Sequence, residues 1–165
     1  GYFSISIGLM HRKEIIAGAT YNPILNEFFW AHKGSGSWIN NQRLRVSNRD
    51  KFEGSVFATG IQIKHADILD RCVSQVSHML KKASIRIMGS AALDLAHVAS
   101  GKFDGFWVSR LNIWDIAAGI ILIKEAGGVC LNVEGKEFNP LKDEVLVASS
   151  AAISNQLLKN LQIFT

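Results

Sequence analysis

Long hydrophobic runs are missing from this chain of 165 residues, and so are the cysteine patterns of disulfide-rich domains. Lys124 and Glu125 interrupt the longest apolar stretch before it reaches the roughly 18 residues that a membrane-spanning helix needs. The two cysteines, Cys72 and Cys130, are too few for a disulfide framework or a paired-cysteine zinc site. The opening GYFSISIG lacks the basic and apolar regions of a secretory signal. We therefore expect a cytoplasmic protein that makes no use of a membrane.

Several catalytic motifs are missing as well. The histidines show none of the H-x-x-x-H or H-E-x-x-H spacings of metal sites, and no G-x-S-x-G sequence provides a nucleophile elbow. Neither a P-loop nor a dinucleotide fingerprint is present, and KGSGSW, residues 33–38, is predicted to be a tight turn. These gaps disfavour serine hydrolases, zinc hydrolases of the H-E-x-x-H type and nucleotide-binding enzymes.

Basic residues give the chain a net charge of +4, which permits an anionic substrate or partner. The densest basic group is NQRLRVSNRDK, residues 41–51. No aromatic residues are interleaved there, as base stacking on a nucleic acid would require. This group therefore favours a solvated loop or an edge strand over a nucleic-acid surface.

Residues 1–52 carry the pattern of an antiparallel sheet. Phe3, Ile5, Ile7 and Leu9 alternate with smaller residues, so the bulky apolar set shares one face of a strand. Asn22 and Pro23 signal a turn between two further strand-like segments. The predicted strands after the first cover residues 14–21 and 27–31, and KGSGSW is expected to end the meander.

Residues 53–165 alternate between strands and helices, which indicates a layered α/β arrangement. The predicted fold class is thus α/β, an α+β layered sandwich in which an antiparallel β meander precedes an alternating α/β layer. Strands are predicted at residues 55–60, 84–89, 105–108, 128–133 and 144–150, and helices at 67–82, 90–101, from about Trp114, and at 151–162. The first helix should bury a stripe made of Ile68, Leu69, Cys72, Val73, Val76, Met79 and Leu80.

Two predicted helix starts carry polar residues that suit a site. Gly89 and Ser90 precede one helix, and Trp114 and Asp115 open another. Helix amino termini offer free N–H groups and a positive dipole end, which together favour a phosphate. An acid such as Asp115 either caps its helix or presents an oxygen to a hard cation such as Mg²⁺. Spacing alone leaves both roles open.

A resemblance to a known protein family distinguishes between the two roles of Asp115. WDIAAGIILIKEAGG, residues 114–128, resembles the carboxy-terminal signature of the inositol monophosphatase family. GSAALDLAHVASGKFDGFW, residues 89–107, and KGSGSWINNQRLRVS, residues 33–47, resemble the segments that precede it. The similarity runs along essentially the whole chain and is greatest to bacterial members. It implies the layered sandwich shared by inositol monophosphatases and fructose bisphosphatases.

The resemblance implies a Mg²⁺-dependent phosphatase that hydrolyses inositol monophosphate or a similar small sugar phosphate. Asp115 would be the catalytic carboxylate and a ligand of the metal, and Gly89, Ser90, Ala91 and Val108 would contact the substrate. The family also implies a cytoplasmic homodimer. Two alternatives remain: a non-catalytic partner of the transcription and ribosomal RNA machinery, and a sibling phosphatase for bisphosphorylated sugars or nucleotides.

The chain departs from the family pattern in two respects. The family's other metal ligands lie in an upstream region that this sequence lacks, so the chain alone is expected to be inactive, with the apolar face of its first strand exposed. Val108 replaces a glutamate that binds a substrate hydroxyl, which leaves the substrate open. Arg110 has two open roles, contact with an anionic group or a surface position. We expect Asp94, Asp104 and Glu125 to be structural, Trp30, Trp38 and Trp107 to be core or interface residues, and Trp114 to wedge its helix against the sheet.

Overall fold

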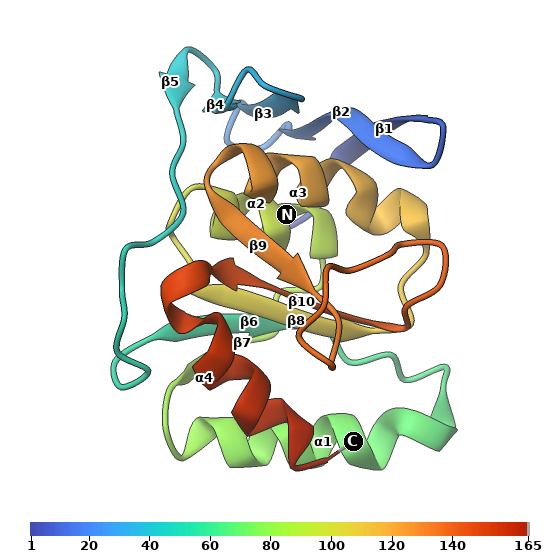
Figure 1. The fold of residues 1–165 in the computed structure, drawn as a ribbon, viewed down its shortest axis with the longest axis vertical. Helices are drawn as coiled ribbons and strands as arrows, with labels where there is room; N and C mark the ends of the chain where they lie inside the picture. The colour runs from blue at the N-terminus through green and yellow to red at the C-terminus, as the bar shows by residue number, and fades with distance from the viewer. Residues whose placement is uncertain (165) are drawn as a thin grey trace.

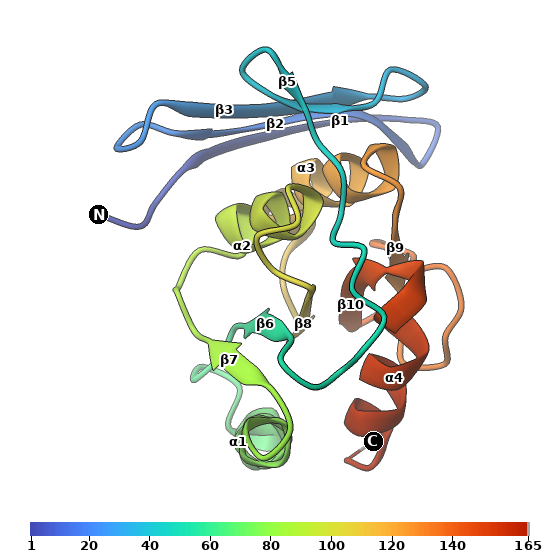
Figure 2. The ribbon, with the colours of Figure 1, turned by 90° about the vertical axis from the view of Figure 1, so that its left-hand side faces the viewer.

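Two sheets and four helices form four layers in the computed structural model, which describes residues 1–164 (Figure 1). The first sheet covers α2 and α3, the second sheet lies beneath these helices, and α1 and α4 pack on its far face (Figure 2). This arrangement confirms the predicted layered α+β sandwich. No helix in residues 1–164 is both long and apolar enough to cross a membrane. The helices are α1 (Ala66–Leu80), α2 (Ala91–Ala99), α3 (Ile113–Glu125) and α4 (Ala151–Gln162).

The first sheet is an antiparallel meander with the order β1-β2-β3-β4-β5. It extends past the predicted end of the meander, because Ser37 to Ile39 pair with β3 as a further strand. Gln42 and Arg43 then form a short edge strand, one of the two forms expected for the basic segment. The strands are β1 (Ile5–His11), β2 (Glu14–Asn22), β3 (Glu27–His32), β4 (Ser37–Ile39) and β5 (Gln42–Arg43).

The second sheet has the order β7-β6-β8-β10-β9 and is mixed. β6 runs parallel to β7 and β8, whereas β10 is antiparallel to β8 and β9. Helices cover both faces, so every residue of β8 and β10 is buried, as expected for the central strands of such a sheet. The strands are β6 (Val56–Thr59), β7 (Ser84–Arg86), β8 (Gly105–Ser109), β9 (Gly128–Leu131) and β10 (Val145–Ser150).

Small residues let α3 lie very close to the first sheet. A Cβ atom added to Gly18 in β2 would lie 2.6 Å from the Cα of Ala118 in α3, and one added to Gly8 would lie 2.6 Å from the Cβ of Ala117. Such distances are shorter than any real carbon contact, so larger residues at these positions would separate the layers. This contact sets the distance between α3 and the first sheet, and with it the position of the residues at the start of α3.

The opposite, outer face of the first sheet is apolar and exposed, as predicted. Phe3, Ile5, Ile7 and Leu9 have exposed fractions from 54% to 64%. On the same face, Trp30 stacks on Trp38 with ring centroids 5.9 Å apart. The outer face therefore joins aliphatic side chains on β1 to an aromatic pair on β3 and β4. An apolar patch of this kind is the normal signature of a contact surface.

Two predictions about side-chain direction are wrong. Val73 and Leu80 are 50% and 58% exposed instead of joining the buried stripe of α1. Gln75 is buried in their place and donates to the carbonyl of Leu161 in α4 at 3.5 Å. Trp114 does not wedge α3 against a sheet, because its side chain is 68% exposed. Trp107, by contrast, is a core residue as predicted.

Candidate active site

A cavity of about 580 Å³ lies where the amino termini of α2 and α3 meet. Residues of both helix starts singled out in the sequence thus line one cavity. The residues predicted to bind substrate or metal, namely Gly89, Ser90, Ala91, Val108 and Asp115, all line it. The rest of the lining includes Ser4 and Ser6, the segment 60–65 that follows β6, two further residues of α2, Phe106 of β8, and four residues between β8 and Asp115.

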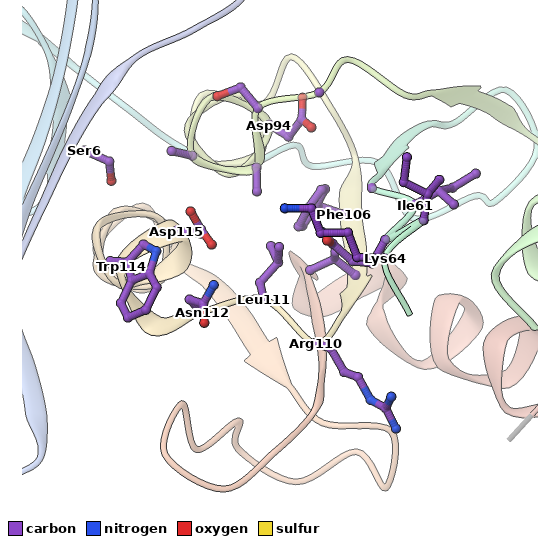
Figure 3. A pocket seen from close by; sticks show the side chains of 18 of the residues that line it. Ser6, Ile61, Lys64, Asp94, Phe106, Arg110, Leu111, Asn112, Trp114 and Asp115 are labelled. Carbon is purple, nitrogen blue, oxygen red and sulfur yellow. The ribbon is translucent and has the colours of Figure 1, made fainter. Parts of the chain in front are cut away.

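Asp115 is not the cap of α3, which corrects one of its two possible roles. The helix begins at Ile113 with Asn112 in the cap position, so Asp115 is the third helical residue. Its side chain is partly buried and makes no hydrogen bond or ion pair with any residue from 1 to 164. Figure 3 shows its carboxylate directed into the cavity, toward α2. A carboxylate that has no structural partner is available for a cation or a substrate.

The start of α2 is built as an anion site would be. Gly89 adopts a φ of +93°, a left-handed conformation that favours glycine, immediately before the helix. Ser90 is the cap residue, and its hydroxyl accepts the backbone N–H of Leu93 at 3.5 Å. The remaining N–H groups of the first turn carry the positive end of the helix dipole.

One wall of the cavity is apolar. Phe106, Val108 and Leu111 line this side, and Val108 is 2% exposed. A Cβ added to Gly60 would lie 3.4 Å from a methyl carbon of Val108, so the wall is packed against the segment that follows β6. None of these three side chains can hydrogen-bond a hydroxyl group.

Arg110 lines the rim of the cavity, but its guanidinium is already engaged. It forms ion pairs with Asp67 of α1 and with Glu144, the latter at 3.3 Å. Figure 3 shows its side chain pointing away from Asp115. The geometry therefore favours the surface role over direct contact with an anionic substrate.

Asp94 was expected to be structural, yet it also lines the cavity and belongs to a buried polar cluster. The hydroxyl of Tyr2 donates to its Oδ1 at 2.8 Å and lies 3.2 Å from Nδ1 of His97. Burial raises the pKa of Asp94 to about 7, although the bond from Tyr2 opposes the rise. Burial lowers the pKa of His97 to about 4, because the ring lies against Phe29 and Phe103.

These two shifts predict opposing effects of pH on stability. The Asp94 contribution is fully present below the ordinary pKa of 3.8 and is lost as pH rises through about 7. The His97 contribution is present above 6.5 and is lost as pH falls through about 4. In Asp94→Asn only the His97 effect remains. Between pH 4.5 and 6.5, the free energy of unfolding of Asp94→Asn should therefore increase with pH more steeply than that of the parent. The difference in slope should be up to about 1.4 kcal/mol per pH unit, measured by urea titrations. Parallel pH profiles for the two proteins would contradict this assignment.

The other expected structural acids behave as predicted. Asp104 accepts the backbone N–H of Val56 at 2.8 Å, and Glu125 accepts the N–H groups of Gly34 and Gly36, both at 2.8 Å. Glu125 thereby ties the KGSGSW turn to the end of α3, away from the cavity.

Sequence reasoning missed several other lining residues, among them two serines, a lysine and a histidine. Ser6 lies on the inner face of β1, Ser4 lies just before that strand, and Lys64 and His65 follow β6. The alternation that placed Ile5 and Ile7 on one face was the available signal for the two serines. Nothing local marks Lys64 or His65.

The cavity does not form a complete metal site from this chain. Within residues 1–164, no three side chains of the Asp, Glu, His or Cys type are grouped so that they could hold a metal ion. Asp115 is available, whereas Oδ1 of Asp94 already accepts a hydrogen bond from Tyr2. Mg²⁺ requires near-octahedral oxygen coordination, so these residues fit one ligand position of such a site and not the whole site.

Comparisons with known proteins agree with the resemblance. The model of the inositol monophosphatase family matches residues 1–164. An inositol-1-monophosphatase of Caulobacter vibrioides is 38% identical over 98% of this chain and 64% of its own length. A Nus factor SuhB of Pasteurella multocida is 36% identical over 98% of this chain and 60% of its own length.

The fold agrees too. The crystal structure of the extragenic suppressor protein suhB from Bartonella henselae superposes with a TM-score of 0.91 at 39% identity, covering 98% of this chain and 62% of that one. The chain thus spans less than two thirds of the length of these relatives. The family match over residues 1–164, the relatives and the shared fold lead to one conclusion: the chain belongs to the inositol monophosphatase family.

Proposed function

We propose that this chain forms the substrate-holding part of a Mg²⁺-dependent phosphomonoester hydrolase acting on inositol monophosphate or a similar small sugar phosphate. The observation that carries the proposal is the meeting of two helix amino termini at one cavity, beside a carboxylate that has no hydrogen-bond or ion-pair partner among residues 1–164. The first feature suits a phosphate and the second suits a hard cation.

Each part of the cavity has a task in this proposal. The backbone at Gly89, Ser90 and Ala91 binds the phosphoryl oxygens through free N–H groups, since a helix amino terminus stabilises negative charge. The wall at Val108 contacts the alcohol part of the substrate. Asp115 supplies one oxygen ligand of the metal site. The other ligands would come from the share of the family's length that this chain does not span.

Phosphate release from inositol 1-phosphate tests the proposal. The 165-residue chain should show no turnover, with or without Mg²⁺. A chimaera in which the Caulobacter relative supplies the missing share should show Mg²⁺-dependent turnover. A chimaera that has a native circular dichroism spectrum, yet releases no phosphate from inositol 1-phosphate, glycerol 2-phosphate or fructose 1,6-bisphosphate, would overturn the proposal.

Val108 should set the preference for the alcohol part of the substrate. In the chimaera, Val108→Glu adds an acceptor to an apolar wall, so kcat/KM for inositol 1-phosphate should rise about tenfold relative to phenyl phosphate, which has no hydroxyl to bind. Val108→Leu is the matched control, because it changes volume without adding an acceptor. Equal changes in both variants would show that volume and not hydrogen bonding decides the preference.

A second candidate function is non-catalytic binding to the transcription machinery, favoured by the Nus factor name of the Pasteurella relative. Its test is a pull-down of RNA polymerase and Nus proteins with the chimaera and with its Asp115→Asn variant. Equal binding by both would separate this function from catalysis. A homodimer, a cytoplasmic location and a bisphosphorylated substrate remain predictions that sedimentation, fractionation and the substrate series would address.

A further inference from the structure

A second cavity, of about 710 Å³, lies apart from the candidate active site. It is formed by residues 13–15 at the start of β2, by Lys33 after β3, by the second half of α3 and by residues 137–142. Lys124 on its wall is nine residues after Asp115, which corresponds to about 14 Å along the helix. Its volume falls within the range of small-molecule sites. We call it the lysine-rimmed cavity, after Lys13, Lys33, Lys124 and Lys142.

The floor of the lysine-rimmed cavity is apolar. Ile120, Ile121 and Phe138 line it and are at most 5% exposed, so they are held firmly by the core behind them. Leu141 lies at the edge and is 52% exposed, which leaves an uncovered apolar side chain beside the opening. The apolar surface open to a ligand is therefore that of Leu141 and of Ile15, which is half-buried, and a hydrocarbon body would bury it against the firm floor.

Two of the four rim lysines have no acidic partner among residues 1–164. Glu14 is paired with Lys33 and Glu137 with Lys124, each at 2.6 Å. Both oxygens of Glu125 accept backbone N–H groups. Lys13 and Lys142 therefore have no carboxylate partner within residues 1–164. All three acids of the rim are engaged, so the charge available to a ligand is positive.

We propose that the lysine-rimmed cavity binds a small amphipathic anion, an aromatic ring system that carries one carboxylate or sulfonate group. The ring lies against Leu141 and Ile15, above the buried floor, and the anionic group lies between Lys13 and Lys142. This site is independent of the proposed phosphatase activity, and its failure would leave that proposal untouched.

Equilibrium dialysis of the 165-residue chain with naphthalene-2-sulfonate tests the site. The sulfonate should bind more tightly than neutral naphthalene-2-methanol, and its affinity should fall as salt is raised. The double variant Lys13→Glu/Lys142→Glu should weaken sulfonate binding about tenfold, since each exposed charge reversal removes one attraction and adds one repulsion. Leu141→Asp should weaken it as well.

Three control variants locate the bound probe. Lys81→Glu/Lys159→Glu makes the same charge change just after α1 and on α4. Lys64→Glu reverses a charge of the candidate active site, and Ile7→Lys breaks the apolar outer face of the first sheet. All three should bind the sulfonate like the parent chain. Equal binding of the neutral analogue would overturn the proposal. The proposal would also be overturned if any of these controls lost sulfonate binding while Lys13→Glu/Lys142→Glu retained it.

Discussion

Asp115→Asn should reduce Mg²⁺-dependent phosphate release by the chimaera more than about 100-fold. Loss of a residue that only hydrogen-bonds to a metal ligand costs up to about 100-fold, and loss of the ligand itself should cost more. The physical reason is that asparagine keeps the shape of the side chain but removes the negative charge that a hard cation requires. Phosphate release at saturating inositol 1-phosphate, measured over a range of Mg²⁺ concentrations, would report both the loss and any shift in metal affinity.

The same substitution should have little effect on folding. Asp115 is not the helix cap, and its side chain has no hydrogen-bond partner within residues 1–164. Only its favourable position near the positive end of α3 is lost, which costs about 0.5 kcal/mol. Trp114→Ala is a suitable neighbour control, because that side chain is 68% exposed. A parallel loss of stability and activity in Asp115→Asn would instead assign the residue a structural role.

Gly18→Val should lower the free energy of unfolding of the chain by about 3 kcal/mol. The added Cβ would meet the Cα of Ala118 at 2.6 Å, and backbone cannot rotate away from a clash as a side-chain end can. Either β2 or α3 must move, and both are packed against the core. Urea unfolding followed by far-ultraviolet circular dichroism would measure the change.

Ala19→Val provides the matched control for this substitution. Ala19 is the next residue of β2, and it faces the outer side between Ile7 and Trp30. Valine suits a strand, and the outer face has room for it, so stability should change by no more than about 0.5 kcal/mol. Similar destabilisation by both substitutions would mean that α3 is not pressed against the sheet at Gly18.

Periodicity predicted most of the fold because it reflects which face of each element is buried. The alternation in β1 and the apolar run of β10 led to the correct elements, since a strand has only two faces. The set of residues predicted to be buried along α1 was too wide. Most of the contacts of this helix are with β7 and α4, so it buries a narrow strip that includes Gln75 and leaves Val73 exposed.

The candidate site was predictable only where it coincided with local patterns. Gly89, Ser90 and Asp115 stand at helix starts, which the sequence marks. Asp94 was missed because its partner, Tyr2, is 92 positions away, and no spacing rule connects them. The lysine-rimmed cavity has no motif either, since it brings together four parts of the chain that only the fold places side by side.

The four tryptophans lie in three different environments, whose spectroscopic signals can be told apart. Trp30 and Trp38 lie on the outer face with their rings 12° from parallel, close enough for their excited states to couple and to give a paired circular dichroism band. Trp107 is enclosed in the core, and Trp114 stands in solvent at the cavity mouth. A segment that covers the outer face should thus alter the paired band, while a ligand in the cavity should change the emission of Trp114 alone.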